Sequence, residues 1–397
     1  MVDLIVEAAN AARTGDVPAR RLAIERLASE PRRGVAREAA VLLEAHVGRL
    51  WDRGWQPADV SRVVGRELDG GAEALVRRVV AAQAASYEAL GRRVAPAWMA
   101  QVDEADAPPR AGEPYLLLEQ GEWIETLDTL ASLLALLTML PALPELVDPP
   151  SRWRDGTLVA GGALPDGLLE RVRALLAKAE ATTFDAEAES FTAKAQELMA
   201  RHRIDRAMFD AGRDHGAERP LGRRIGIDDP YADARALLLA EIAGANGCRA
   251  VWSKPFGFTT VFGFAHELGA VEELFTSLLV QATAALRREG SKQDAFGRSR
   301  TTRFRRSFLT AFAFRIGERL RCVVADTVAA ADGELGGDLL PVLASRADET
   351  RAAADAAFPE TRTFAARAND AEGWHAGRLF GDVADLGVRR AVTRRSA

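Results

Sequence analysis

Residues 168–202 read LLERVRALLAKAEATTFDAEAESFTAKAQELMARH, and this stretch decides the fold. It contains two runs in which apolar side chains recur every three or four positions, joined by a short connection from Thr182 to Asp185. That spacing places the apolar side chains of each run on one face of an amphipathic helix. The two faces can bury each other if the chain reverses at the connection, so we predict an antiparallel helical hairpin.

The polar residues of the connection have a structural role in this hairpin. Thr182 and Thr183 offer hydroxyl oxygens that can cap the second helix. Asp185, Glu187 and Glu189 follow in its first turn, where the helix dipole favours negative charge. We therefore attribute these carboxylates to helix formation and not to a catalytic site.

The hairpin also resembles a known family. The runs RVRALLAKAE and KAQELMARH, with a Thr turn and Glu-Ala between them, are similar to the domain-of-unknown-function 2786 family. Asp185 stands where family members often have Pro, which changes the helix start but not the pattern. Further along, VFGF, RSFLTAFAFRIGERL and NDAEGWHAGR resemble the uncharacterised domain that commonly follows, and GWQPAD resembles a family leader. The resemblance implies no activity, cofactor or catalytic residue.

Composition and periodicity distinguish four segments. We expect an N-terminal helical domain at residues 1–117, an acidic apolar helix with a Pro/Gly linker at 118–165, the hairpin at 166–212, and an α+β domain at 213–397. Clusters of Pro and Gly between periodic stretches are typical of a linker. The predicted fold class is α+β and mainly helical, with a small sheet covered by helices.

The C-terminal segment alternates between strand and helix patterns. Short runs rich in β-branched and aromatic residues predict strands, and longer periodic runs predict the helices that cover them. We expect strands at 223–227, 248–252 and 259–264, a fourth strand at 341–343, and helices at 231–245, 267–288 and 303–331.

The composition excludes several classes of protein. The 397 residues carry a net charge of −5, 48% of them are hydrophobic and only 2 are Cys. These values exclude collagen-like, disulfide-stapled and wholly disordered chains. The first residues lack the basic and apolar regions of a secretory signal. The longest uncharged stretch, Thr129–Pro144, is shorter than the roughly 20 apolar residues that a spanning helix needs. We therefore expect a cytoplasmic protein without a membrane segment, in which Cys248 and Cys322 are reduced.

The sequence contains no established catalytic motif. It lacks the phosphate-binding loop, the dinucleotide turn, the nucleophile elbow and the paired-histidine zinc signature. His266 precedes Glu267, but Ala270 stands where that signature needs a second histidine. Glu372 and His375 have the spacing of two ligands on one helix face, yet the second copy that a di-metal bundle needs is missing. We assign no catalytic residue, metal ligand or cofactor, and a hydrolase with a degenerate metal site near Glu372 is the alternative.

The strongest electrostatic signal lies between Arg287 and Arg306, where eight basic and two acidic residues give a net charge of +6. The segment also contains Gly, Ser and Thr residues and two aromatic residues, Phe296 and Phe304. A flexible basic loop of this composition can neutralise phosphates and stack on bases. We therefore predict a non-enzymatic protein that associates with DNA or RNA. The predicted contacts are Arg298, Arg300, Arg303, Arg305 and Arg306, with Lys178 and Lys194 of the hairpin extending the surface.

Other interpretations stay open at this point. The basic segment could be a solvated loop, or it could dock onto the protein's own acidic residues. The turn at 53–57 could belong to a helix-turn-helix that places Arg62 and Arg66 in a major groove. The N-terminal helices could instead form a protein-interaction scaffold, for which no partner can be named.

Three glycines repeat every four residues in a predicted helix at 372–382: Gly373, Gly377 and Gly381. Each Gly inside a helix costs about 1 kcal/mol relative to Ala. Their repetition therefore indicates that something approaches this helix face closely. A neighbouring helix is the favoured explanation, and a ligand or a nucleic-acid backbone is the other.

Overall fold

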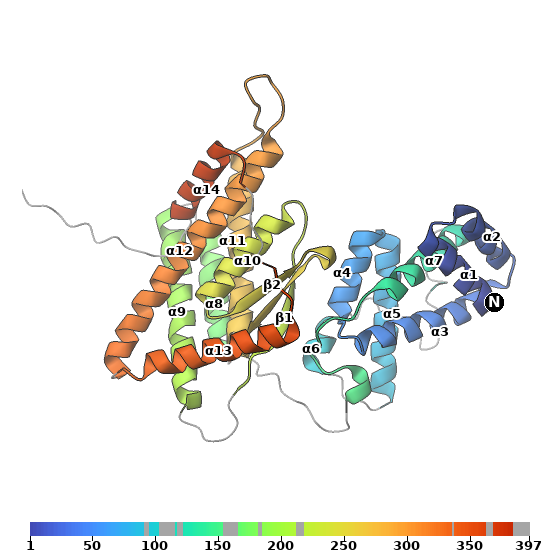
Figure 1. Cartoon of the computed structure of the whole chain (residues 1–397), viewed down its shortest axis with the longest axis horizontal. Helices are drawn as coiled ribbons and strands as arrows, with labels where there is room; N and C mark the ends of the chain where they lie inside the picture. Colours follow the sequence, from blue (N-terminus) through green and yellow to red (C-terminus); the bar gives the residue numbers. More distant parts are fainter. Residues whose placement is uncertain are drawn as a thin grey trace, which may run out of the picture. The chain divides into compact units, whose positions relative to one another are not determined.

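The computed structural model describes residues 1–90, 95–102, 116, 122–153, 166–181, 185–211, 218–335, 337–362 and 368–383. In these residues the chain forms helices and one three-stranded antiparallel sheet, which confirms the mainly helical α+β fold (Figure 1). The chain divides into two compact units, unit 1 at Met1–Gly161 and unit 2 at Gly162–Ala397. Among the described helices, none is both long enough and apolar enough to cross a bilayer.

The described part of unit 1 is helical. Its helices are α1 (Val2–Thr14), α2 (Val17–Ala28), α3 (Arg32–Trp51), α4 (Pro57–Glu67), α5 (Gly70–Ala89), α6 (Pro96–Met99), α7 (Trp123–Met139) and a 3-10 turn at Pro150–Arg152. The acidic apolar helix expected from the sequence is α7, which packs against α1, α2 and α3. It buries Leu127, Leu130 and Leu134, so it is part of the core of unit 1.

The turn between α3 and α4 is fixed by contacts with a distant segment. Pro57 begins α4. Proline suits the first turn of a helix because the backbone N–H groups there have no intrahelical hydrogen-bond acceptor, so the N–H that proline lacks is not missed. Trp55 donates its indole N–H to the carbonyl oxygen of Pro141 at 2.7 Å. The backbone N–H of Leu143 donates to the carbonyl oxygen of Arg53 at 2.8 Å. The α3–α4 pair is therefore held against the chain that follows α7.

Unit 2 contains the sheet and a second set of helices. Its elements are α8 (Asp166–Ala181), α9 (Asp185–Ala211), β1 (Leu221–Gly226), α10 (Ala232–Ala245), β2 (Arg249–Ser253), a 3-10 turn at Lys254–Phe256, β3 (Phe258–Gly263), α11 (Ala265–Arg288), α12 (Thr301–Leu335), α13 (Leu339–Ala357) and α14 (Ala371–Val383). The strands pair antiparallel in the order β1-β3-β2. Helices α10, α11 and α13 pack against the sheet, and every residue of its central strand β3 is buried.

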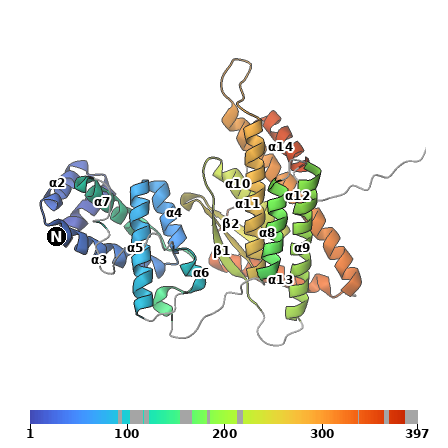
Figure 2. The same cartoon turned by 180° about the vertical axis from the view of Figure 1, so that it is seen from behind.

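The predicted hairpin forms, and it shares its core with the C-terminal elements. Helices α8 and α9 pack along each other, while α8 also contacts α11 and α9 contacts α12 (Figure 2). Val172 and Leu176 of α8 belong to the same buried cluster as Leu274 of α11 and Phe308 of α12. The hairpin and the α+β segment are therefore one folding unit around one core.

The fourth strand expected at residues 341–343 is wrong, because these residues lie in α13. Leu339 and Leu343 are four positions apart and pack on Ile204 and Ala207 of α9. That spacing belongs to one helix face. A run of three apolar residues is too short to distinguish a helical period from a strand period. Pro341 is accommodated because it lies in the first turn of the helix.

The glycine repeat packs helix α14 onto helix α12, which confirms the neighbouring-helix interpretation. A Cβ atom on Gly373 would collide with the backbone of Phe304, and one on Gly377 would collide with the backbone of Phe308. A Cβ on Gly381 would meet the side chain of Arg315. Helix α14 can therefore approach the backbone of α12 only because these three positions carry no side chain.

Candidate nucleic-acid interface

The basic segment folds into a hydrogen-bonded hairpin loop between α11 and α12. Residues 289–300 leave the end of α11 and return to the start of α12, and Figure 1 shows the loop protruding beyond both helices. The backbone N–H of Arg300 donates to the carbonyl oxygen of Lys292 at 3.0 Å, and that of Asp294 donates to Arg298 at 2.9 Å. Gln293 and Ser299 form a β-bridge. We refer to residues 289–300 as the tip loop.

Asp294 organises the end of the tip loop. One oxygen of its carboxylate accepts hydrogen bonds from the backbone N–H groups of Phe296 and Arg298, both at 2.9 Å. Its carbonyl oxygen accepts from Gly297 at 3.0 Å, and Gly297 has a φ of +76°, which glycine adopts without strain. This turn leaves the side chain of Phe296 86% exposed.

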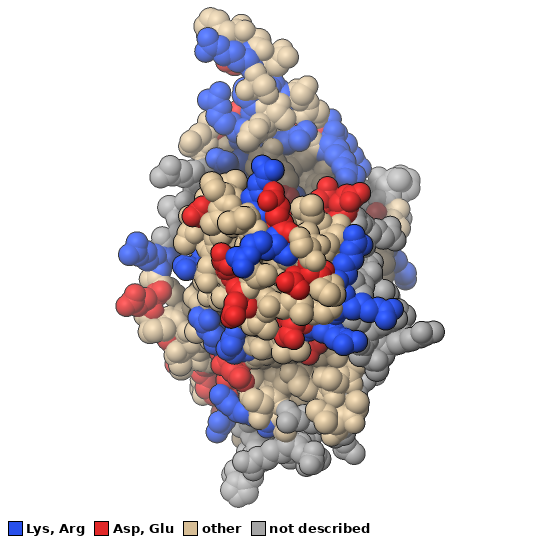
Figure 3. Space-filling model, turned by 90° about the vertical axis from the view of Figure 1, so that its right-hand side faces the viewer, with Lys and Arg blue, Asp and Glu red and all other residues tan. Residues whose placement is uncertain are grey.

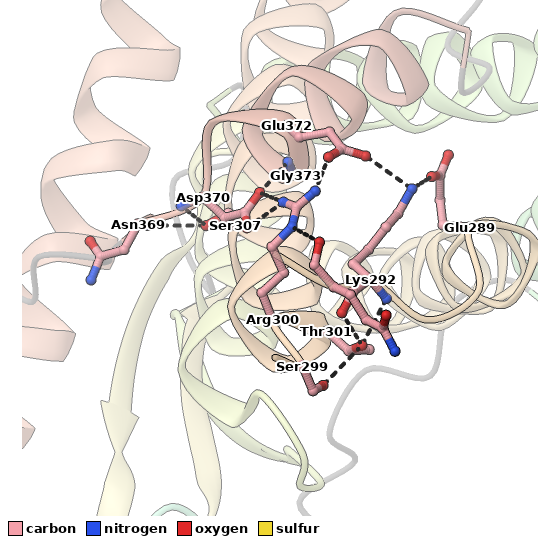
Figure 4. A network of polar contacts seen from close by, with 11 residues as sticks. Glu289, Lys292, Ser299, Arg300, Thr301, Ser307, Asn369, Asp370, Glu372 and Gly373 are labelled. Atoms are coloured by element: carbon pink, nitrogen blue, oxygen red, sulfur yellow. Dashed lines mark hydrogen bonds and ion pairs between the residues drawn. The ribbon is translucent and has the colours of Figure 1, made fainter. Parts of the chain in front are cut away.

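The base of the tip loop is held to the start of α14 by ion pairs, which we call the clamp: Lys292 and Arg300 with Glu289, Asp370 and Glu372 (Figure 4). Arg300 pairs with the carboxylates of Asp370, at 2.8 Å, and Glu372. Lys292 lies between two acids, 2.9 Å from Glu289 and 3.0 Å from Glu372. Two of the eight basic residues of the segment are thus neutralised inside the protein.

A second set of contacts fixes the acids of this clamp. Asp370 also accepts a hydrogen bond from the backbone N–H of Gly373 at 2.9 Å and so caps α14. The hydroxyl oxygen of Ser307, on α12, accepts from the backbone N–H groups of Asn369 and Asp370 at 3.0 Å (Figure 4). The start of α14 is therefore held by α12 as well as by the tip loop.

The protonation states of the clamp follow from these contacts. Hydrogen bonds to Glu372 and then to Asp370 raise the pKa of Arg300. Arg300 and then Lys292 lower the pKa of the Glu372 carboxyl. Burial would raise the pKa of Asp370, but the Gly373 N–H and the Arg300 guanidinium outweigh it and lower that pKa. Arg300, Asp370 and Glu372 are therefore charged at neutral pH.

The other predicted arginines lie on the loop and on the first two turns of α12. Arg298, Arg303 and Arg306 are exposed, and Arg305 is half-buried. Arg287 and Arg288 are exposed at the end of α11. In the described part of the chain, no carboxylate lies within ion-pair distance of any of these six side chains. We call the five exposed ones (Arg287, Arg288, Arg298, Arg303 and Arg306) the basic tip.

Phe304 cannot stack on a base, which corrects the expectation that both phenylalanines of the segment are available. It is fully buried in α12, with its ring 6.4 Å from that of Phe308. The ammonium group of Lys292 lies 4.6 Å from the centre of the Phe304 ring. The ring of Phe304 therefore packs against Lys292 of the clamp, and Phe296 is the exposed aromatic residue of the segment.

The comparisons with known proteins identify one part of the chain. Residues 167–206 match the family described as a protein of unknown function, DUF2786. This segment is a DUF2786 domain. It corresponds to α8 and most of α9, the hairpin predicted from the sequence. No curated protein and no solved structure matched the chain.

Two of the predicted contact residues, Lys178 and Lys194, belong to the DUF2786 domain. Both side chains are exposed. The ammonium of Lys178 lies 5.7 Å from the centre of the Phe191 ring, and Lys194 pairs with Glu197 at 2.9 Å. Among the described residues, these contacts of Lys178 and Lys194 are with their own hairpin and not with the tip loop, so the two lysines are not joined to the basic tip there.

The DUF2786 domain also contributes to a buried polar cluster that the sequence analysis missed. Arg203 of α9 pairs with Glu267 at 3.2 Å, and the rings of His202 and His266 meet edge to face at 5.4 Å. His266 also lies 3.7 Å from Glu218. The adjacent His266 and Glu267 were the only local signal, because Glu267 caps the helix start at Phe264 while His202, Arg203 and Glu218 lie in other segments.

Helix α13 extends this cluster. The guanidinium of Arg346 lies 3.4 Å from the centre of the Phe264 ring and pairs with Asp210 at 2.9 Å. Both ring nitrogens of His266 and two nitrogens of Arg346 are buried without a hydrogen-bond partner in the described residues. The cluster is tightly packed and it links α9, α11 and α13.

The geometry supports neither of two alternative sites, the metal site near Glu372 and the DNA-binding helix-turn-helix with Arg62 and Arg66. Glu372 is occupied by Arg300 and Lys292, and the described residues contain no group of three or more His, Cys, Asp or Glu side chains placed to hold a metal. Arg62 and Arg66 on α4 each have an interaction partner within the chain. The face of unit 1 that is turned to the viewer in Figure 3 mixes basic and acidic side chains without a large patch of one sign.

Proposed function

We propose that this protein binds nucleic acid through the basic tip. The observation that carries the proposal is the arrangement of the eight cations between Arg287 and Arg306. Lys292 and Arg300 hold the tip loop in place by pairing with carboxylates, whereas the five arginines of the basic tip have no such partner in the described chain. Part of the segment therefore docks on the protein's own acids. Arg303 still lies near enough to Asp370 to help lower the pKa of that carboxyl, and the other four arginines of the basic tip have no carboxylate partner in the described residues.

The position of these arginines argues against a purely structural role. Arg303 and Arg306 lie in the first two turns of α12, where the helix dipole disfavours cations, and this helix has no acid in its first turn. Asp370 offsets part of this effect at Arg303, because the two are close enough for Arg303 to help lower the pKa of that carboxyl, and a bound anion would offset it further. A phosphate backbone supplies closely spaced anions, and arginine pairs with phosphate in a bidentate manner.

The experiment is a salt titration of binding. Fluorescence anisotropy with labelled single-stranded DNA, RNA and duplex DNA gives the dissociation constant at each salt concentration. Each phosphate that is neutralised contributes about 0.7 (single strand) to 0.9 (duplex) to the slope of log K against log salt. The variant Arg298→Ala/Arg303→Ala/Arg306→Ala should therefore flatten the slope by about 2 to 3.

The matched control changes the net charge by the same amount elsewhere. Arg33, Arg37 and Arg171 are also exposed and without an ion-pair partner in the described chain. Replacing these three by Ala should leave the slope unchanged. Equal slopes for the wild type and the basic-tip variant, or no saturable binding at low salt, would refute the proposal.

A further inference from the structure

We infer that Phe296 is a base-stacking residue and that the nucleic acid bound at the basic tip is single-stranded. This inference rests on the proposed function and specifies its ligand. It follows from the way the tip loop presents one aromatic ring beside cationic side chains.

The first observation is the exposure of Phe296. At 86%, it is the most exposed of the large hydrophobic side chains in the described chain. Its neighbours Ala295 and Gly297 offer little apolar surface, and the described residues leave the ring uncovered. Single exposed apolar residues are common on protein surfaces, and exposure alone would decide nothing.

The second observation is the rigidity of the turn that carries the ring. The Phe296 N–H is bonded to the Asp294 carboxylate, as is the Arg298 N–H two residues later. Two backbone hydrogen bonds and the Gln293–Ser299 bridge close the loop below. The clamp of Arg300 on Asp370 then fixes the base of the loop. Little backbone entropy is therefore lost when the ring contacts a ligand.

The third observation is the charge around the ring. Arg298, two residues away, is exposed and unpaired, whereas the carboxylate of Asp294 is used by the turn. A protein or lipid contact would be served by a continuous apolar patch, which this loop lacks. An aromatic ring next to an unpaired arginine matches single-stranded nucleic acid, because its bases expose their faces while its phosphates lie within a few ångströms. In a duplex these faces are covered by neighbouring base pairs.

The test compares three ligands of equal length: a single-stranded oligonucleotide, the same strand with abasic sites throughout, and the duplex. The abasic strand keeps the phosphates and lacks the bases. Phe296→Ala should weaken binding to the single strand about 5- to 140-fold. It should leave binding to the abasic strand and the salt slope unchanged, because stacking neutralises no phosphate.

Two further variants separate stacking from general apolar contact. Phe296→Trp should retain the affinity for the single strand, and Phe296→Leu should lose most of it. Because the side chain is exposed, none of the three variants should change the thermal midpoint of unfolding, which checks that each is folded.

The outcomes distinguish this inference from the proposed function. If the basic-tip variant flattens the salt slope while Phe296→Ala binds the single strand like the wild type, the proposed function stands and the stacking role is refuted. Equal losses on the duplex or on the abasic strand, or a Phe296→Leu variant with wild-type affinity, also refute stacking. If the protein binds phosphatidylserine vesicles, loses that binding in Phe296→Ala and binds no oligonucleotide, both the proposed function and the stacking role are refuted and the loop is assigned to a membrane surface.

Discussion

Replacing Gly377 by Ala should loosen helix α14, although Ala is the better helix former. The new Cβ would lie 2.9 Å from the Cα and carbonyl carbon of Phe308 and closer still to its carbonyl oxygen. These are backbone atoms of a buried helix, so α14 has to move away. Overpacking of this kind costs about 1 to 3 kcal/mol, and the higher helix propensity of Ala offsets about 1 kcal/mol of it.

The matched control is Gly333→Ala in α12. A Cβ on Gly333 would meet nothing within 4 Å, so only the propensity gain applies there. The difference between the two variants isolates the steric cost, which we expect to be about 1 to 3 kcal/mol. Hydrogen-exchange mass spectrometry of unit 2 measures it locally, and the α14 amides should exchange about 5- to 140-fold faster in Gly377→Ala than in Gly333→Ala. Equal exchange in the two variants would refute the close packing of α14 on α12.

Two other predictions concern the polar networks. Burial, and then the neighbouring His266, lower the pKa of His202 from 6.5. The contribution of the neutral His202 ring to stability is therefore complete above pH 6.5, and it is lost as the pH falls through the lower pKa of the folded state. The pKa of Glu218 is lowered from 4.5, chiefly by its close contact with His266, so the contribution of this carboxylate to stability is lost as the pH falls below 4.5. The thermal midpoint of unfolding should thus fall on acidification below pH 6.5, through His202, and again below pH 4.5, through Glu218. If a His202→Gln variant still shows the fall below pH 6.5, His202 is not its cause. Arg300→Gln should speed amide exchange in residues 292–300 and leave the thermal midpoint of unfolding nearly unchanged, because the Arg300–Glu372 pair is exposed to solvent. Unchanged exchange in the loop would show that Arg300 does not order it.

The sequence predicts elements whose information is local. The hairpin follows from its helical period, the α14 packing from the glycine repeat, and the three strands from short β-rich runs bounded by turns. The error at Phe304 has a local cause as well. Phe304, Phe308 and Phe312 are spaced four apart and lie on the buried face of α12. The basic segment extends as far as Arg306, so Phe304 was grouped with the loop although the expected helix began at 303.

Other features depend on contacts between distant segments. Arg300 and Asp370 are 70 positions apart, and nothing near Arg300 indicates that its charge is used by a helix start so far along the chain. The same holds for Arg346, whose partner Asp210 is 136 positions away. A count of basic residues therefore overstates the available charge, and only the folded chain separates the cations that hold the loop from those that face solvent.

The core shared by the DUF2786 domain and the C-terminal elements determines how much of the chain is needed to bury the hairpin. The family match begins at 167 and ends at 206, whereas the buried cluster continues without a break into α10, α11 and α12. A gene fragment limited to the match would encode two helices with their inward faces, including Val172 and Ala195, open to water. A fragment limited to the match therefore needs a further segment or a partner to cover these faces, and the unit that folds is larger than the unit of similarity.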